Sequence, residues 1–269
     1  MRWGFIFAVA LAGCAPHDEG RKLVSLQAEI FPDGQPADTR TDLLRILDWT
    51  ARNADMSDAP EFDQLTVSML RERSALEMYA HAYRPNVAGG YCSVTAVFSA
   101  MVFREFGFDA LNIDFGAVEG SMTHVTTVVF NPFGQRQFYI LDPTFNFHVE
   151  RPDATWAPLN EILARAPVRI VERPTMRDQL WPLGRPVPAA YGNCEPGPGL
   201  LVCTHPNDSL ERFMSTHARE LDALGLDPTP SALFDLLRLR VYSITGGSAE
   251  ARAALQELLA AHDVPLGPS

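Results

Sequence analysis

The segment from Cys92 to Phe106 constrains the fold more than any other part of the chain. Apolar residues occupy most of its positions, and the polar ones are small until Arg104 and Glu105 near its end. A helix that is apolar on nearly every side is buried rather than laid on a surface. Gly107 is a suitable residue to end it. The sequence therefore predicts a central buried helix here.

Three strands are predicted directly after this helix. The segments are rich in β-branched and aromatic residues, and they cover 110–115, 122–130 and 137–141. Asn131-Pro132-Phe133-Gly134 makes a turn between the second and third, which makes that pair antiparallel. A buried helix packed on a small antiparallel sheet is an α+β core.

The remainder of the chain divides into regions of different composition. The main domain is expected over residues 39–173, with further helices at 39–53, 62–82 and 156–166. Residues 174–207 are rich in Pro and Gly and predict a linker or a long ordered loop. Residues 208–269 predict a helical C-terminal region, with helices over 209–224, 231–242 and 248–261.

The N-terminus has the pattern of an export signal. Arg2 precedes the apolar run Gly4–Ala10, which is too short to span a bilayer as a helix. Leu11-Ala12-Gly13-Cys14 resembles the bacterial lipoprotein box, although an ordinary secretory signal with an unrelated cysteine is the alternative. The resemblance implies a signal peptide over 1–13, a lipidated Cys14, and a tether over 14–38.

A lipidated Cys14 implies that the lipid bilayer is a partner of this chain. The expected location is the bacterial cell envelope, at the periplasmic face of the outer membrane. Nucleic acid is not an expected partner, because the net charge is −11 and phosphate binding favours basic proteins.

Cysteine spacing points to different uses for different thiols. Cys194 and Cys203 flank a short Pro/Gly-rich stretch and can form a disulfide in an oxidising compartment. Cys92 is then left unpaired. A free thiol in an exported chain favours a chemical role, although a small buried hydrophobic residue is the commonest fate of a single cysteine.

Cys92, His124 and Asp142 follow one another in the order of a Cys-His-Asp arrangement for acyl transfer. Cys92 follows Gly89-Gly90-Tyr91 at a helix start, where the helix dipole stabilises a thiolate. His124 lies in a predicted strand, and Asp142 ends the next one. The predicted roles are nucleophile, general base and then acid, and orienting carboxylate. Considered alone, His124 could be a structural histidine, and Asp142 could simply open an Asp-Pro turn.

The oxyanion of such a reaction is expected to bind the backbone N–H of Cys92, with Asn86 or Tyr91 as a second donor. No metal and no organic cofactor are implied. The sequence contains no HExxH, CxxC, GxSxG or P-loop pattern.

The stretch from Pro85 to Phe147 resembles the transglutaminase-like superfamily. The matching pieces surround the three candidate residues and are Gly90-Tyr91-Cys92, Phe106–Ala110, Thr123-His124-Val125 and Leu141-Asp142-Pro143-Thr144. The resemblance implies a papain-like core with Cys92 as nucleophile, His124 as base and Asp142 as orienting residue. Many members carry an aromatic residue where this chain has Thr126.

The resulting prediction is an exported, thiol-dependent enzyme acting on amide bonds of a protein or peptide substrate. Peptidase, deamidase and transglutaminase-type acyl transfer all remain open. One alternative is an inactive papain-like scaffold or binding lipoprotein. Another is an arylamine N-acetyltransferase-like enzyme, which Gly89-Gly90-Tyr91-Cys92 resembles but which Ala88 and Val94 fit poorly.

Overall fold

A computed structural model describes residues 26–34, 38–53, 92–117, 123–173, 181–182, 194–197, 200–203 and 209–267. The chain divides into one unit over Met1–Gln35 and a second over Pro36–Ser269. In the first unit, residues 26–30 are helical. The predicted signal peptide, Cys14 and the predicted helix over 62–82 lie outside the described residues. The architecture below is that of the second unit.

A six-stranded antiparallel sheet forms the centre of this unit, in the order β5-β4-β3-β2-β1-β9. Its strands are β1 (Asp109–Gly116), β2 (Thr123–Phe130), β3 (Phe138–Asp142), β4 (Phe147–Glu150), β5 (Arg169–Glu172) and β9 (Val241–Gly246). The first three match the strands predicted from the sequence, and the predicted α+β class is confirmed.

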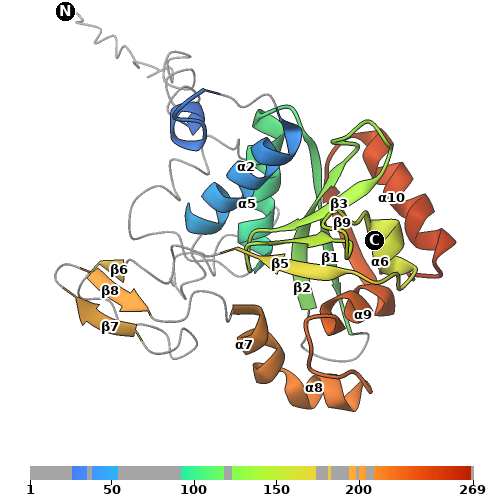
Figure 1. Cartoon of the computed structure of the whole chain (residues 1–269). Coiled ribbons are helices and arrows are strands. Elements are labelled where there is room, and N and C mark those ends of the chain that lie inside the picture. Colours follow the sequence, from blue (N-terminus) through green and yellow to red (C-terminus); the bar gives the residue numbers. More distant parts are fainter. Residues whose placement is uncertain are drawn as a thin grey trace, which may run out of the picture. The chain divides into compact units, whose positions relative to one another are not determined.

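Helix α5 (Cys92–Glu105) packs on β1 and β2 and is the central buried helix that the sequence predicts. Phe98 and Phe103 are almost completely buried, and the Thr127 hydroxyl of β2 donates a hydrogen bond to the Ala96 carbonyl at 3.0 Å. Helix α2 (Thr39–Asn53) packs on α5, where Trp49 contacts Phe98 with 5.9 Å between ring centroids. Figure 1 shows these two helices together beside the sheet.

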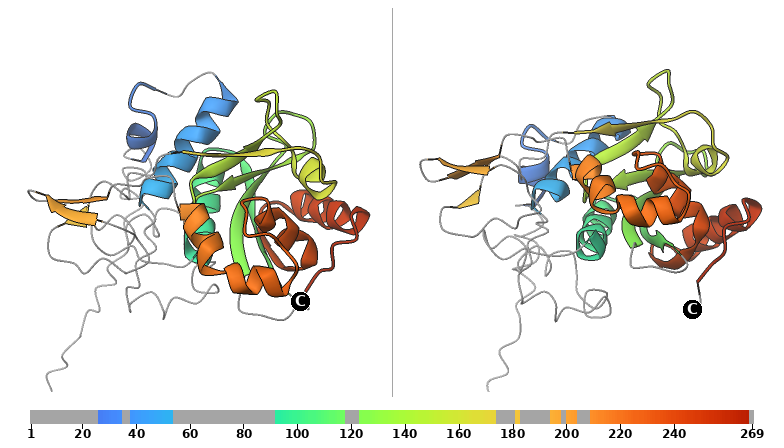
Figure 2. Two further views of the ribbon diagram at one scale, coloured as in Figure 1. Left: turned by 60° about the horizontal axis from the view of Figure 1, so that its bottom comes forward. Right: turned by 90° about the horizontal axis from the view of Figure 1, so that it is seen from below.

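The other face of the sheet carries the C-terminal helices, as Figures 1 and 2 show for α9 and α10. Leu111 and Val128 of the sheet share one apolar cluster with Leu237 and Leu255 of these helices. The helices are α6 (Leu159–Leu163), α7 (Ser209–Thr216), α8 (Ala218–Ala223), α9 (Ala232–Leu239) and α10 (Ala249–Ala261). Helices thus cover both faces of the sheet.

The C-terminal region over 208–269, which is predicted to be helical, also contains a strand. The helix predicted over 231–242 ends at Leu239, because Arg240 is extended with φ −170° and ψ 137°. The chain then forms β9, which pairs with β1 at the edge of the main sheet. The β-branched and aromatic residues of Val241–Thr245 suit a strand better than a helix. The helix predicted over 209–224 is likewise divided into α7 and α8 at His217.

The predicted linker over 174–207 contains a small three-stranded sheet, in the order β6-β8-β7. Its strands are β6 (Trp181–Pro182), β7 (Cys194–Gly197) and β8 (Leu200–Cys203). Cys194 lies directly opposite Cys203 in the antiparallel register of β7 and β8. Since only the backbone of these two residues is described, their disulfide stays a prediction.

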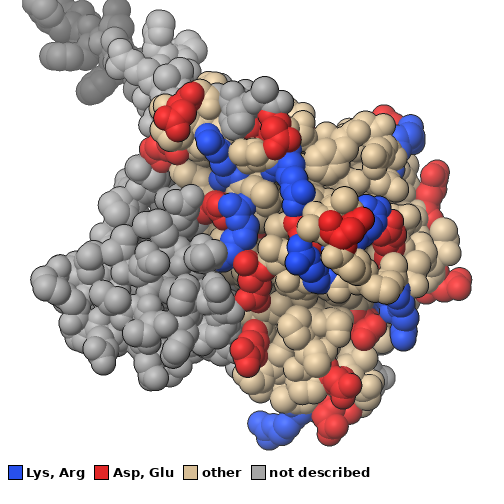
Figure 3. Space-filling view, viewed as in Figure 1, with Lys and Arg blue, Asp and Glu red and all other residues tan. Residues whose placement is uncertain are grey.

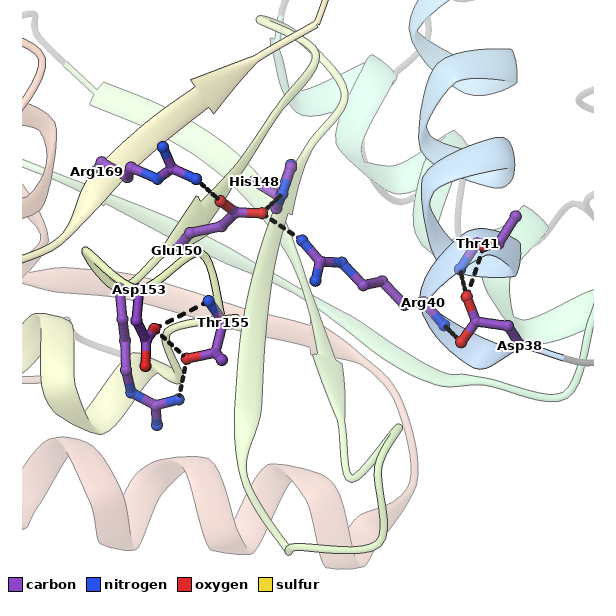
Figure 4. Close-up of polar contacts among 9 residues, drawn as sticks. Asp38, Arg40, Thr41, His148, Glu150, Asp153, Thr155 and Arg169 are labelled. Carbon is purple, nitrogen blue, oxygen red and sulfur yellow. Dashed lines mark hydrogen bonds and ion pairs between the residues drawn. The ribbon is translucent and has the colours of Figure 1, made fainter.

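Glu150 of β4 holds the N-terminal end of α2 against the sheet (Figure 4). Its nearly buried carboxylate accepts hydrogen bonds from Arg40 of α2 and Arg169 of β5 and contacts His148 Nε2 at 2.9 Å. The Trp156 ring contacts both groups, with its centroid 5.1 Å from that of His148 and 5.7 Å from the Arg40 guanidinium carbon. Because α2 packs on α5, this network also supports the helix that carries Cys92.

Candidate active site

Cys92 is the first residue of α5, and its side chain is partly buried. The backbone N–H groups of the first helical turn have no partners within the helix, so they are directed at the space beyond the N-terminal end of α5. Ala96, one turn later, is tied to Thr127 of β2. One turn of helix rises about 5.4 Å, which brings Cys92 level with the start of β2.

His124 is the second residue of β2 and is 2% exposed. Three aromatic rings surround its imidazole, with centroids 5.1 Å away for Phe145, 5.7 Å for Phe115 and 6.0 Å for Phe213. Phe213 belongs to α7, so the C-terminal region contributes to the surroundings of this histidine. These contacts leave the ring little freedom to rotate.

Asp142 ends β3 and is fully buried. Its Oδ2 lies 2.6 Å from His124 Nε2, and its Oδ1 accepts a hydrogen bond from the Phe145 N–H at 2.9 Å. The geometry follows from strand register. Thr127 pairs with Leu141, so Asp142 lies one position further along, opposite Thr126 and on the same face as His124.

The Cys92 thiol completes the group, because it lies close enough to the His124 imidazole to raise the pKa of that ring. Burial opposes a charged imidazole here. The charge and hydrogen bond of Asp142, together with Cys92, outweigh burial and raise the pKa of His124 to about 10. The imidazole is therefore protonated at neutral pH.

A thiol held beside an imidazolium has the composition needed for nucleophilic catalysis. The imidazolium stabilises the thiolate and is also positioned to return a proton to a leaving group. A carboxylate on the far nitrogen fixes the ring orientation and stabilises its positive charge. The structure thus brings together the three residues that the sequence singled out, from three different elements.

The other candidate residues have different positions. Asn86 and Tyr91, proposed as oxyanion donors, and Cys14, proposed as the lipidation site, lie outside the described residues. Of the other histidines, His148 is also buried and paired with a carboxylate, Glu150. Within the described ranges, no group of three or more His, Cys, Asp or Glu residues is arranged to hold a metal ion.

Sequence reasoning missed the aromatic residues around His124 and a further carboxylate, Asp114. Asp114 lies in β1, its charge interacts with that of His124, and its Oδ1 is buried. Asp114 could have been identified from the sequence, because it is a carboxylate within a segment of largely apolar strand residues. Phe213 gave no such signal, because nothing local to α7 indicates which strand it will contact.

Comparisons with known proteins add little to this geometry. No protein-family model and no curated protein matches the chain. One solved structure, described as "Crystal structure of a TGase", aligns with 15% sequence identity and a TM-score of 0.30. The alignment covers 51% of this chain and 35% of that one, so it spans about a third of the other protein. Such a likeness is compatible with a transglutaminase-like fold but does not assign one.

Proposed function

We propose that this chain is a thiol-dependent enzyme that acts on amide bonds through an acyl-enzyme on Cys92, within a papain-like, transglutaminase-like core. The observation that carries this proposal is that His124, whose Nε2 lies 2.6 Å from Asp142 Oδ2, is close enough to the Cys92 thiol at the start of α5 for that thiol to raise its pKa. The His124 and Asp142 side chains are almost completely buried, where such polar groups are found only when they are paired.

In the proposed reaction, the Cys92 thiolate attacks the carbonyl carbon of the substrate amide. The negative charge that develops on the carbonyl oxygen is stabilised by the backbone N–H of Cys92, with Asn86 or Tyr91 as a second donor. The His124 imidazolium then transfers its proton to the leaving nitrogen as the C–N bond breaks. The products of this half-reaction are a free amine or ammonia and a thioester on Cys92.

Acylation of Cys92 by p-nitrophenyl acetate tests this proposal without knowledge of the natural substrate. The full chain is expected to release p-nitrophenol in a burst equal to one acyl group per Cys92. Mass spectrometry should locate the acetyl group on that residue. The Cys92→Ala variant should lose the burst, while Cys194→Ala should keep it.

A binding scaffold with an inactive papain-like domain makes the opposite prediction. In that case the Cys92 thiol would react no faster than the thiol of free N-acetylcysteine under the same conditions. That result would refute the enzymatic proposal directly.

We further propose that the chain is exported and anchored to the bacterial cell envelope through a lipid on Cys14, and that it acts on a protein or peptide there. Acidic and basic side chains are interspersed over the described face in Figure 3, without a continuous basic surface that nucleic acid would require. None of the described helices is long and apolar enough to cross a bilayer.

Replacement of Cys14 tests the anchor. In a bacterial host, the wild-type chain is expected in the membrane fraction and in the detergent phase of a Triton X-114 partition. Cys14→Ala should move it to the aqueous phase, because attached acyl chains supply the membrane affinity. Equal partition of the two proteins would contradict the proposed lipidation.

A further inference from the structure

His148 of β4 is a buried titratable side chain that the proposed reaction does not use. It is 3% exposed and shares a strand face with Glu150, whose carboxylate binds Arg40 of α2. Its Nε2 lies 2.9 Å from Glu150 Oε1, and since a carboxylate only accepts hydrogen bonds, this nitrogen carries the hydrogen. Figure 4 shows His148, Arg40 and Arg169 around the one carboxylate.

The other ring nitrogen of His148, Nδ1, is the atom that an added proton must bind. This nitrogen is buried and makes no hydrogen bond. The indole that contacts the imidazole, that of Trp156, can donate a hydrogen bond but cannot accept one. A protonated Nδ1 would therefore be a buried charged donor without an acceptor, which destabilises a folded arrangement.

The charges around His148 also disfavour its protonation. The Glu150 carboxylate already accepts hydrogen bonds from two guanidinium groups, so a protonated His148 would be the third cation on one carboxylate. Arg173, which follows β5, adds positive charge near the ring, although Asp48 of α2 pairs with it. Burial and the charges of Arg173 and Arg40 together outweigh the attraction of Glu150 and lower the pKa of this imidazole.

Helix α2 is attached to the rest of the unit near both of its ends. Near the C-terminal end, Trp49 packs on Phe98 of α5. Near the N-terminal end, Arg40 donates a hydrogen bond to the buried Glu150 carboxylate of the sheet. If the cluster around this carboxylate opens, the first half of α2 can therefore leave the sheet while the second half stays packed on α5.

We propose that protonation of His148 releases the N-terminal half of α2 from the sheet, so that mild acid loosens this part of the fold. Opening the cluster lets water accept a hydrogen bond from the protonated Nδ1, whereas the closed cluster offers no acceptor. The inference does not depend on the proposed function. Its consequence for the candidate site is that α5, which begins at Cys92, loses part of its support, because α2 packs on α5.

The direction of the pH effect follows from the lowered pKa of His148. An imidazole with a pKa below its usual value of 6.5 binds a proton more readily in the open cluster than in the closed one. The closed cluster is therefore most stable above about pH 6.5 and weakens as the pH falls below it. Because one proton is taken up, the opening equilibrium rises by at most about tenfold per pH unit. Burial favours the neutral form of Glu150, but the neighbouring imidazole and guanidinium groups outweigh it and lower its pKa, so it stays ionised in this range.

Amide hydrogen exchange of α2 in the full chain tests this inference. Rates at about pH 7.5 and about pH 5.5 are each divided by the rate of an unstructured peptide at the same pH. In the wild-type chain, protection of the first half of α2 should fall about 3- to 10-fold between these conditions, while that of the half containing Trp49 should change less. In His148→Gln, protection should be the same at both pH values, because glutamine retains a donor for Glu150 but does not titrate.

His262→Gln is the matched control, because His262 lies at the end of α10, and it should respond to acid like the wild-type chain. Nuclear magnetic resonance of the wild-type chain needs no variant to fold. The His148 signal, identified by its nuclear Overhauser contacts with the Trp156 ring, should titrate below pH 6.5. A titration at or above that value would overturn the inference. So would an equal loss of protection in wild type and His148→Gln, or no loss in the wild type.

Discussion

Replacing His124 with glutamine is expected to slow acylation of Cys92 by about 10²- to 10⁴-fold, the usual contribution of a general acid–base residue. Glutamine retains polarity and hydrogen bonding at a buried site but holds no proton to exchange. The variant also removes the cation that stabilises the thiolate. The burst rate with p-nitrophenyl acetate measures the first effect, and iodoacetamide alkylation of Cys92 against pH measures the second.

His148→Gln provides a matched control for that experiment. His148 is as deeply buried as His124 and also contacts a carboxylate, but its partner Glu150 belongs to the network that holds α2. A general effect of removing a buried histidine should therefore appear in both variants. If His124→Gln and His148→Gln reduce acylation equally, the catalytic role of His124 is wrong.

Asp142→Asn should reduce acylation by a similar factor of about 10²–10⁴, because the orienting carboxylate both aligns the imidazole and stabilises its charge. The substitution also lowers the pKa of His124. In the wild-type chain, burial is outweighed by Asp142 and Cys92, which raises this pKa to about 10. Without the carboxylate, burial is opposed only by Cys92, so the imidazole loses its proton at lower pH.

Nuclear magnetic resonance of ring-labelled histidine measures that change directly. The His124 signal should titrate near pH 10 in the wild-type chain and at clearly lower pH in Asp142→Asn. Asparagine retains an oxygen that can accept the hydrogen bond donated by the Phe145 N–H to Asp142 Oδ1 in the wild type, so the turn after β3 is preserved. An unchanged His124 titration would show that Asp142 does not control the charge on the ring.

The meeting of His124 with Asp142 could be predicted from the sequence because it depends on local rules. A short turn joins their strands, and alternation within each strand determines which side chains share a face. The place of Cys92 followed similarly from the start of an apolar helix. These contacts join elements that are neighbours in the sequence, and the spacing of apolar and polar residues predicts such contacts well.

The rest of the site depends on contacts between distant parts of the chain. Phe213 reaches His124 from α7, and β9 pairs with β1 across more than a hundred residues of sequence. The helix expected over 231–242 passes through Arg240, where the chain is already extended and leads into β9. Periodicity within a segment contains no information about which remote strand it will join, so tertiary contacts decided both features.

The position of β9 has a consequence for the order in which the main sheet can be completed during synthesis. Leu111 of β1 pairs with Gly246, and residues 265–267 in turn hydrogen-bond to Val241 of β9. The ribosome must therefore add more than a hundred residues after β1 before β9 can pair with it at this edge of the sheet. Contacts between such distant residues also slow folding, because a long stretch of chain must close before they form. The edge of the sheet beside β1 thus stays open to solvent until β9 has been made.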